Sequence, residues 1–491
     1  MKRKNVMLIT PPYHSGVVES AGTWLNLGFV YIAGSLRNAG YDVEIYDAMS
    51  YFHTYDEIGK RIEAHKPDVV ATTAITASIN DCIEVCKLSK QINPEIVTVL
   101  GNVHPTFMWE EILRDHGDYI DCIVRGEGEF TLSELLNCHF SRGDASKVKG
   151  IAYWNGEKAV TTPQREYIQD LDVLPAAWDL IDWKIYSYRP KENSILGIVS
   201  SSRGCNQQCS FCSQQLFWSR KWRARSPENF VSEIEYLHRT YNVNVVMMPD
   251  ETPTFDRMRW ERILDLLRER RMDIELLMET RVEDIIRDQD ILWKYKEAGI
   301  AHIYAGVEST SQETLDRFKK DIKVEESRLA IDLINQHDII SETSFVLGMP
   351  EETKESINTT VELAKHYSPD MAFFLAIAPW PYADIYKELD PYIITKDYSK
   401  YNLIEPVVKP ANMTIDELRD DLNRATRIFY MDKFLRLQNM SSFKRDYMMA
   451  TFKLLMEHSC IGSQIKSIHD SMPEEMKRFI RDFAEHFSPI P

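Results

Sequence analysis

The chain lacks long apolar runs and any excess of basic residues. No stretch reaches the roughly 18 apolar residues that a membrane-spanning helix needs, although 44% of the 491 residues are hydrophobic. The formal net charge is −17, whereas nucleic-acid-binding proteins usually present a basic face. The opening MKRKNVMLIT leads into a polar PPYHSG instead of a cleavage site. We therefore expect a cytoplasmic, globular protein with no nucleic-acid partner and no transmembrane segment, in which the short basic run SRKWRAR (219–225) is a solvated loop.

Cysteine is also scarce, and three of the eight cysteines are spaced C-x3-C-x2-C in the segment SSRGCNQQCSFCSQQ. No other Cys or His lies between Ser194 and Glu233, whereas a structural zinc site needs four ligands. An odd group of close cysteines without an export signal also argues against structural disulfides. Three thiolates can instead hold three irons of a [4Fe-4S] cluster and leave the fourth iron open to a small molecule. The predicted cluster ligands are Cys205, Cys209 and Cys212, and the expected buried free thiols are Cys82, Cys86, Cys122, Cys138 and Cys460.

Residues 1–145 alternate short apolar runs with helical periods, which predicts a parallel, doubly wound α/β sheet of Rossmann-like type. Such sheets bind ligands in the crevice at the carboxyl ends of their strands. The five segments at those ends, PPYHSG, DAMS, TTAITAS, GNVHPT and RGEGE, are small and polar, and no G-x-G-x-x-G indicates a dinucleotide. The expected strands are Asn5–Thr10, Asp42–Tyr46, Asp68–Ala71, Ile96–Leu100 and Tyr119–Val124, with helices near Phe29–Asn38, Asp56–His65, Ile79–Lys90 and Trp109–Asp115.

A connector, residues 146–193, leads to a second α/β region. Asn155-Gly156 between apolar runs predicts a hairpin over Ile151–Thr162, and a proline- and aromatic-rich linker that should pack follows it. Residues 194–390 contain six βα repeats, which predict a partial (β/α)6 barrel with its site at the carboxyl ends of the strands. The expected strands are Leu196–Ser201, Val243–Met248, Ile274–Thr280, His302–Val307, Ser341–Leu347 and Met371–Ile377, and the clearest helices are Glu228–Tyr241 and Arg257–Arg270.

Residues 391–491 are expected to form a helical C-terminal region rich in methionine and aromatic residues. Such a stripe at helical spacing is more often core than a cofactor site. The alternative hypothesis is that these helices close over the barrel mouth and hold a planar, apolar substrate. The residues on which that hypothesis rests are Phe429, Tyr430, Met431, Phe434, Tyr447 and Met448.

The cysteine spacing resembles that of the radical SAM superfamily, whose cluster binds S-adenosylmethionine (SAM) through its amino and carboxylate groups. MMPDE (247–251), ETR (279–281), AGVES (305–309) and FVLGMPEE (345–352) fall where that family places its SAM contacts. A SAM pocket needs a carboxylate for the ribose diol, for which Glu308 or Glu251 is suitable, and an arginine for the carboxylate, for which Arg281 is suitable. Helix caps, ion pairs and packing glycines are the structural alternatives for these residues. The resemblance implies SAM contacts at Phe211, Asp250, Glu251, Arg281, Gly306, Glu308, Ser309 and Gly348.

The strand-end segments of residues 1–145 resemble the cobalamin-binding domain of B12-dependent radical SAM enzymes. The D-x-H-x-x-G box that supplies a cobalt-binding histidine in some corrinoid proteins is absent, so no histidine on cobalt is expected. The family's usual Gly-Gly after the fourth strand is Gly101-Asn102 here, which narrows the room beside the corrin. A degenerate flavodoxin-like spacer is the alternative. The resemblance implies cobalamin contacts at Thr10, Pro11, Tyr13, His14, Ser15, Thr73, Ala74, Thr76, Gly101, Asn102, His104, Gly126, Glu127 and Gly128.

Segments from about residue 5 to 440, among them APWPYADIYKEL, DYSKYNLIEPVVKP and RATRIFYMDKFLR, resemble the oxygen-independent magnesium-protoporphyrin IX monomethyl ester oxidative cyclase family. The resemblance implies an enzyme in which a SAM-derived 5′-deoxyadenosyl radical takes hydrogen from a tetrapyrrole side chain and water supplies the ketone oxygen. It also implies reduced flavodoxin or ferredoxin as the electron donor. A cobalamin-dependent radical C-methyltransferase on a tetrapyrrole or other apolar substrate is the second hypothesis, and a non-catalytic corrinoid or cluster sensor is the third. No residue beyond the cofactor contacts is predicted to be catalytic.

Overall fold

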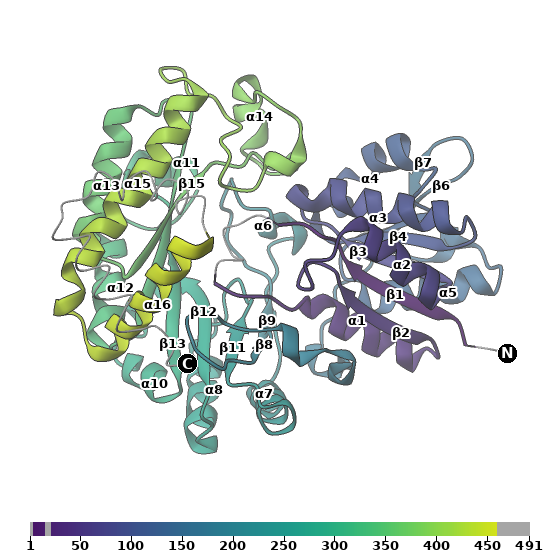
Figure 1. The fold of residues 1–491 in the computed structure, drawn as a ribbon, viewed down its shortest axis with the longest axis horizontal. Coiled ribbons are helices and arrows are strands. Elements are labelled where there is room, and N and C mark those ends of the chain that lie inside the picture. The colour runs from purple at the N-terminus through teal and green to yellow at the C-terminus, as the bar shows by residue number, and fades with distance from the viewer. Residues whose placement is uncertain (1–2, 15–20, 459–491) are drawn as a thin grey trace.

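The structure, a computed structural model, describes residues 3–14 and 21–458, with side chains up to residue 454. Two α/β bodies lie side by side, and the N-terminal one is drawn in purple and blue at the right of Figure 1. The second body contains the open barrel and, in yellow, the helices that end the described chain. The crevice between the two bodies is bordered by part of the predicted cofactor loops.

The N-terminal sheet has seven strands in the order β2-β1-β3-β4-β5-β6-β7. The first five strands pair in parallel, and the last two pair antiparallel. Helices cover both faces, so the central strands are nearly continuous apolar runs such as the buried Val6–Ile9 of β1. The strands are β1 Asn5–Thr10, β2 Asp42–Asp47, β3 Val69–Thr73, β4 Val97–Gly101, β5 Cys122–Val124, β6 Ile151–Trp154 and β7 Ala159–Thr161, and the helices are α1 Leu27–Asn38, α2 Tyr55–His65, α3 Ile79–Ile92, α4 Val103–His116 and α5 Glu129–Phe140.

The predicted doubly wound sheet and the predicted hairpin are both confirmed. Gly156 has a φ of 101°, and the side chain of Asn155 accepts hydrogen bonds from the backbone N–H groups of Glu157 and Lys158 at 3.0 Å. The hairpin strands continue the first sheet by pairing with β5. The predicted fifth strand is shortened to its last three residues, Cys122–Val124.

Helix α4 begins at Val103, six residues earlier than the sequence pattern indicated. Asn102 caps it, because its Oδ1 accepts a hydrogen bond from the Val103 backbone N–H at 2.7 Å. Pro105 is tolerated because the N–H groups of a first helical turn have no helical acceptor. The segment GNVHPT is therefore a strand end and a helix start, and His104 and Thr106 are buried in its first turn.

The linker packs against both bodies, as predicted. It forms the 3-10 helices Leu171–Val173, Trp178–Leu180 and Trp183–Ile185, and both of its tryptophans are buried. The Tyr186 hydroxyl donates a 2.9 Å hydrogen bond to Asp47, at the carboxyl end of β2. The linker thus ties the N-terminal sheet to the start of the barrel.

The barrel is an open six-stranded parallel sheet in the order β15-β14-β13-β12-β11-β8, which confirms all six predicted strands. A small antiparallel pair, β9 and β10, frames the cysteine loop. The strands are β8 Leu196–Ile198, β9 Ser202–Arg203, β10 Arg223–Ala224, β11 Val245–Met248, β12 Glu275–Arg281, β13 Ile300–Gly306, β14 Ile340–Leu347 and β15 Met371–Ala376, and the helices are α6 Gln214–Phe217, α7 Pro227–Tyr241, α8 Arg257–Arg270, α9 Val282–Arg287, α10 Leu292–Glu297, α11 Gln312–Arg317, α12 Val324–Gln336 and α13 Lys354–Tyr367.

The chain after β15 is irregular before it becomes helical. The short helix α14 (Tyr386–Leu389) and two 3-10 turns precede α15 (Ile415–Arg436) and α16 (Ser442–His458). Helix α15 packs along α13 and β15, where Phe429 contacts the ring of Phe374. The C-terminal region described by the structure is therefore helical only from Ile415 onward.

Helix α16 lies at the amino end of the barrel, opposite the mouth. Lys444 Nζ is 2.6 Å from Asp370 Oδ2, and Ser441 donates a hydrogen bond to Asp338. Asp370 directly precedes β15 and Asp338 lies two residues before β14, so these contacts fix α16 at the strand starts. The hypothesis that these helices close the mouth is therefore wrong for α16, because Tyr447 and Met448 are drawn into the core instead.

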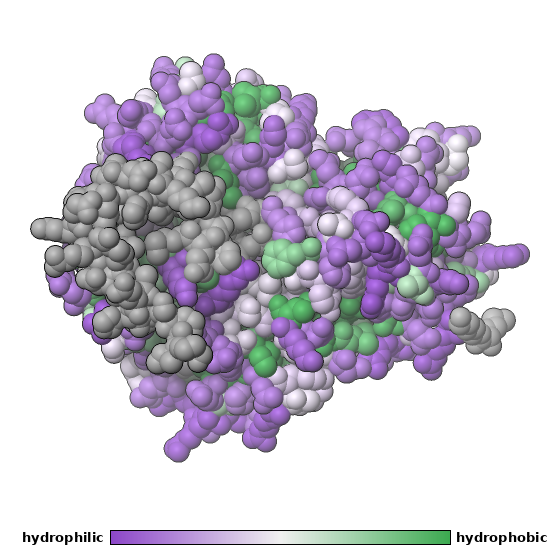
Figure 2. Space-filling model, viewed as in Figure 1, coloured by the Kyte–Doolittle hydropathy of each residue, from purple (hydrophilic) through white to green (hydrophobic). Residues whose placement is uncertain are grey.

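The surface visible in Figure 2 is mainly hydrophilic, and its apolar residues form small separate groups. Within the described ranges, no helix is both long and apolar enough to span a bilayer. The expected buried thiols Cys82, Cys86 and Cys122 are confirmed, Cys138 is partly buried, and Cys460 lies outside the described residues.

Candidate active site

The three predicted cluster ligands lie in one loop between β9 and α6. The backbone N–H of Cys212 donates to the carbonyl of Cys209 at 3.1 Å, and the Gln215 side chain donates to the same carbonyl at 2.9 Å. Phe211 packs against Phe318, with ring centroids 4.8 Å apart, and holds the loop on the barrel. The loop is therefore anchored from both sides while its three thiols remain partly exposed and unpaired with one another.

Burial disfavours the thiolate form of Cys209 and Cys212. It raises the pKa of Cys212 to about 12 and also raises the pKa of Cys209, which Lys320 and Arg281 partly oppose. In the described residues, no three His, Cys, Asp or Glu side chains converge on a single metal ion. This spacing fits a four-iron cluster, because such a cluster binds each thiolate at a different iron and supplies the positive charge that the thiolates need.

Asp250 and Glu251 support the cysteine loop from the end of β11. Asp250 is 0% exposed and accepts hydrogen bonds from Ser201 and Ser202, at 2.7 and 2.6 Å from the two hydroxyls. Glu251 accepts the Gly204 N–H at 2.9 Å and the Trp218 indole N–H at 2.6 Å. Burial raises the pKa of both carboxyl groups. Asp250 thus holds the start of the loop from beneath, whereas Glu251 borders an open cavity.

Glu308 is held at the barrel mouth by two neighbours. Its Oε1 is 2.9 Å from Lys320 Nζ, and its Oε2 accepts a 3.2 Å hydrogen bond from Ser344. Glu308 itself has a φ of 64°, which turns the chain away from β13 at this point. A Cβ on Gly306 would lie 2.6 Å from Glu308 and 2.7 Å from Lys320, so any other residue here would displace the ends of these two side chains.

The other predicted SAM residues are divided between two places. Arg281 forms an ion pair with Glu283. When the Gln207 side-chain amide is oriented with its oxygen toward Arg281, the guanidinium also donates a 2.7 Å hydrogen bond to that oxygen. This contact brings Arg281 to the cysteine loop. Ser309 borders a separate cavity of about 300 Å³, and Gly348, with a φ of 92°, packs against Leu418.

A cavity of about 290 Å³ lies in the crevice between the two bodies. Glycine at position 126 has a φ of 78° and open space where a Cβ would be, so the chain leaves room for a large ligand there. From the N-terminal body the cavity is bordered by the predicted residues Thr73, Gly101, Asn102, Gly126, Glu127 and Gly128. The barrel contributes Ser200, Ser202, Arg203, Phe217, Trp218, Pro249 and Glu251.

Asn102 has a backbone conformation that is normally found in glycine. Its φ of 85° and ψ of −168° lie in a region that is almost exclusive to glycine. Its side chain donates to the Thr73 hydroxyl at 2.9 Å while capping α4. These contacts hold the strained residue at the cavity edge.

The two predicted histidines do not border this cavity. His104 is buried, contacts the Thr76 hydroxyl at 3.1 Å and packs against Tyr382 and Tyr398. Burial lowers the pKa of His104 to about 4. His14 stacks on Phe52 at 5.1 Å. Of the other predicted cobalamin contacts, Ser15 lies outside the described residues, and Thr10, Pro11, Tyr13, Ala74 and Thr76 lie at the same strand ends without bordering the cavity.

A buried ion-pair network joins the bodies beside the cavity. Arg203 donates to Glu127 at 2.8 Å and to Glu129 at 2.6 Å, and Arg223 pairs with Glu127 at 3.0 Å. Burial alone would lower the pKa of Arg203, but Glu129 and Glu127 outweigh it and raise that pKa. The basic run 219–225 is therefore a solvated loop only over its exposed residues 219–221, because Arg223 and Arg225 are buried and pair with acidic residues of other elements.

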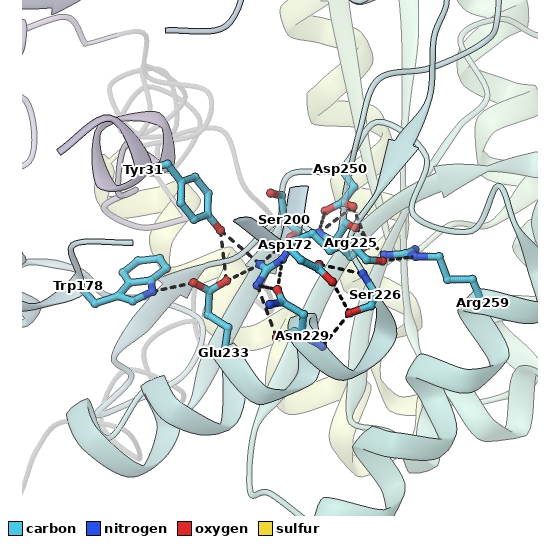
Figure 3. Close-up of polar contacts among 11 residues, drawn as sticks. Tyr31, Asp172, Trp178, Ser200, Arg225, Ser226, Asn229, Glu233, Asp250 and Arg259 are labelled. Atoms are coloured by element: carbon cyan, nitrogen blue, oxygen red, sulfur yellow. Dashed lines mark hydrogen bonds and ion pairs between the residues drawn. The ribbon is translucent and has the colours of Figure 1, made fainter. Parts of the chain in front are cut away.

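Figure 3 shows the second part of this joint, around Arg225. Glu233 of α7 pairs with Arg225, accepts the Trp178 indole N–H at 2.8 Å and accepts the Tyr31 hydroxyl at 3.2 Å. Helix α1, the linker and α7 thus meet at one carboxylate. Sequence reasoning missed Tyr31, Arg203 and Trp218, which all border the cavity, because their partners come from distant segments.

Comparison with known proteins matches each of the two domains to a protein family. Residues 13–136 match the B12 binding domain family, and residues 199–364 match the Radical SAM superfamily. An anaerobic magnesium-protoporphyrin IX monomethyl ester cyclase of Rubrivivax gelatinosus is 36% identical over 92% of this chain and 82% of its own. An uncharacterized methyltransferase of Pyrococcus horikoshii is 30% identical over 88% of this chain and 93% of its own.

The solved structure of the cobalamin-dependent SAM radical enzyme OxsB, with aqua-cobalamin and SAM bound, has a TM-score of 0.70 and 17% identity. The alignment covers 99% of this chain and 75% of that one. The fold and the three-cysteine loop define a radical SAM enzyme. The chain belongs to the cobalamin-dependent radical SAM family, and its cofactors are a [4Fe-4S] cluster, SAM and cobalamin.

Proposed function

We propose that the protein is an oxidative cyclase that acts on a tetrapyrrole side chain. Its Rubrivivax relative is named as an anaerobic magnesium-protoporphyrin IX monomethyl ester cyclase. The observation that carries this proposal is the 36% identity, which extends over 92% of the chain and so includes the region after the barrel. Bound SAM supplies a hydrogen-abstracting radical, and cobalamin supplies one-electron chemistry. The residues of this chain hold the two cofactors, exclude water from the radical and admit the substrate.

The shared cavity supports a reaction that uses both cofactors. Its N-terminal wall contains Asn102 and Gly126, and its barrel wall contains Glu251 next to the cysteine loop. A substrate admitted to this cavity would therefore lie within reach of both cofactors without crossing bulk solvent. The buried Arg203 and Glu129 pair closes one side of the cavity and would keep the walls at a fixed spacing.

We assign the cofactor contacts by position. Cys205, Cys209 and Cys212 hold the cluster, and Glu251, Arg281 and Glu308 are the proposed SAM contacts nearest to it. Thr73, Gly101, Asn102, Gly126, Glu127 and Gly128 are the proposed cobalamin contacts that border the cavity. Reduced flavodoxin or ferredoxin is the proposed electron donor.

The test is an anaerobic turnover of the reconstituted protein with magnesium-protoporphyrin IX monomethyl ester in ¹⁸O-labelled water. We expect a cyclised product that contains one labelled ketone oxygen, detected by mass spectrometry. A product without the label, or no consumption of the porphyrin, would contradict the proposal.

The second candidate is a C-methyltransferase, which the Pyrococcus relative favours because the alignment covers 93% of a protein named as a methyltransferase. The same turnover with SAM deuterated at its methyl group separates the two. A product that gains the deuterated methyl group identifies the methyltransferase, and a product with labelled water oxygen identifies the cyclase.

A further inference from the structure

The exposed part of the basic run takes no part in the proposed cofactor contacts or in the joint between the bodies. It consists of Ser219, Arg220 and Lys221, which are all exposed and together form the exposed basic loop. The Arg220 side chain is 42% exposed, and its Nη2 is 3.8 Å from Asp384 Oδ2. Lys221 forms no ion pair with the described residues, and its Nζ lies 6.0 Å from the centre of the Tyr167 ring. The loop therefore presents positive charge that a single carboxylate only partly neutralises.

The backbone of the exposed basic loop is fixed, although its side chains are exposed. Ser219 has a φ of 49° and Arg220 a φ of 57°, so two consecutive residues occupy a region that residues other than glycine seldom adopt. The Ser219 hydroxyl hydrogen-bonds to the Tyr167 hydroxyl at 2.9 Å. The Lys221 carbonyl packs so closely on Gly204 that no Cβ would fit there. Such a conformation persists only where surrounding contacts enforce it, and it is typical of functional segments.

The exposed basic loop lies against the cysteine loop at two points. Gln215 makes the first contact and is 2% exposed. Its Nε2 donates to the Cys209 carbonyl at 2.9 Å, and its Oε1 accepts a hydrogen bond from Arg220 Nε at 3.0 Å. The second contact is that of Lys221 with Gly204, at the start of the cysteine loop. One buried side chain thus separates an exposed arginine from the backbone of a cluster ligand.

A protein that supplies electrons cannot enter the cavity between the bodies. The cavity has a volume of about 290 Å³ and is bordered by Glu251, a proposed SAM contact. An electron carrier must therefore meet the cysteine loop at an exposed surface. Asn206 and Gln208 of the cysteine loop are exposed but carry no charge. The exposed basic loop combines positive charge with a hydrogen-bonded connection to Cys209.

The charge of the whole chain gives this combination its significance. At a net charge of −17, most of the surface repels an acidic protein, so local positive charge decides where such a protein docks. We propose that the exposed basic loop is the docking site of an acidic protein that carries single electrons. The carrier loses one electron, the cluster held by Cys209 gains it, and no bond forms or breaks. This proposal rests on the proposed function for its need of a reduced cluster, but it serves cyclisation and methyl transfer equally.

The experiment compares Lys221→Glu with the wild type, and Lys158→Glu is the matched control. Lys158 is exposed in the hairpin turn and makes the same change of charge far from the cysteine loop. The reconstituted proteins are mixed with reduced flavodoxin, an acidic carrier of single electrons, and cluster reduction is followed by visible absorbance in stopped flow. We expect reduction to be about 10-fold slower in Lys221→Glu at low salt, because the docking charge is reversed. The control should stay within about 2-fold of the wild type.

A chemical reductant and a binding titration provide the second readout. Reduction by dithionite, which needs no docking site, should proceed at the same rate in all three proteins. The affinity for flavodoxin, measured by calorimetry without SAM or substrate, should fall about 10-fold in Lys221→Glu, and salt should shrink this difference because it screens the charges. Equal flavodoxin rates and affinities in the two variants, no binding of flavodoxin to the wild type, or a loss that dithionite shares would overturn the docking site. A methylated product would overturn the proposed function and leave the docking site standing.

Discussion

At the scale of single residues, the three loop cysteines are the ligands that nothing else in the loop can replace. Cys205→Ala, Cys209→Ala or Cys212→Ala should each abolish the four-iron cluster and SAM cleavage, because each removes the thiolate of one iron. Iron and sulfide analysis of the anaerobically reconstituted variants measures the first effect. Cys138→Ala, a partly buried cysteine far from the loop in sequence, is the control and should retain the cluster. An intact cluster in any of the three variants would contradict the assignment.

His104 makes folding stability depend on pH. Its folded pKa of about 4 is below the unfolded value of 6.5, so the fold favours the neutral ring. The contribution of the neutral His104 ring to the free energy of unfolding is therefore fully present above pH 6.5. It is lost as the pH falls from about 6.5 to about 4, by about 3 kcal/mol in total. Denaturant unfolding at a series of pH values measures this loss. His104→Gln should flatten the dependence, whereas the exposed His139→Gln should not, and equal slopes in both would contradict the account.

Some of these residue roles could be predicted from the sequence and others could not. The cysteines are readable because three ligands of one cluster lie within eight consecutive residues. The roles of three arginines, Arg203, Arg223 and Arg225, could not be predicted from the sequence. Their carboxylate partners Glu127, Glu129 and Glu233 lie on other elements. A basic run reveals nothing about such partners until the fold brings them together.

At the scale of elements, α16 is expected to stabilise the barrel from its amino end. Lys444 and Asp370 form a buried pair with side chains that are 8% and 5% exposed. Lys444→Met should lower the free energy of unfolding by about 3 kcal/mol or more, because it leaves Asp370 buried without its partner. SAM cleavage at the opposite end should persist in the folded fraction. Lys365→Met, which breaks the exposed pair with Glu362, is the control and should cost less than about 1 kcal/mol. Loss of SAM cleavage with unchanged stability would contradict this position for α16.

The elements themselves followed from the sequence pattern wherever strands were buried on both faces. The six barrel strands are local signals of this kind, whereas the half-exposed hairpin followed from its Asn155-Gly156 turn. The start of α4 was missed because Asn102 caps the helix in a conformation normally reserved for glycine. The position of α16 depends on long-range ion pairs, which no periodicity encodes.

At the scale of the whole molecule, Arg203 holds the two bodies together beside the cavity. Arg203→Met should lower the free energy of unfolding by about 3–5 kcal/mol, because Glu129 would stay buried without a partner. Cobalamin retention, measured after gel filtration of the reconstituted protein, should fall as well. Arg37→Met is the control, since it breaks an exposed pair with Asp179 and should leave both properties near the wild type. Equal effects of the two substitutions would mean that the joint does not shape the cavity.

The central claim is that the crevice between the two bodies holds cobalamin opposite the cluster. Anomalous diffraction from crystals of the reconstituted protein, collected at the iron and cobalt absorption edges, tests this claim most directly. The account predicts iron at Cys205, Cys209 and Cys212, and cobalt in the cavity bordered by Asn102, Gly126 and Glu251. Cobalt bound elsewhere on the chain, or a cavity filled by protein side chains in the reconstituted enzyme, would contradict it.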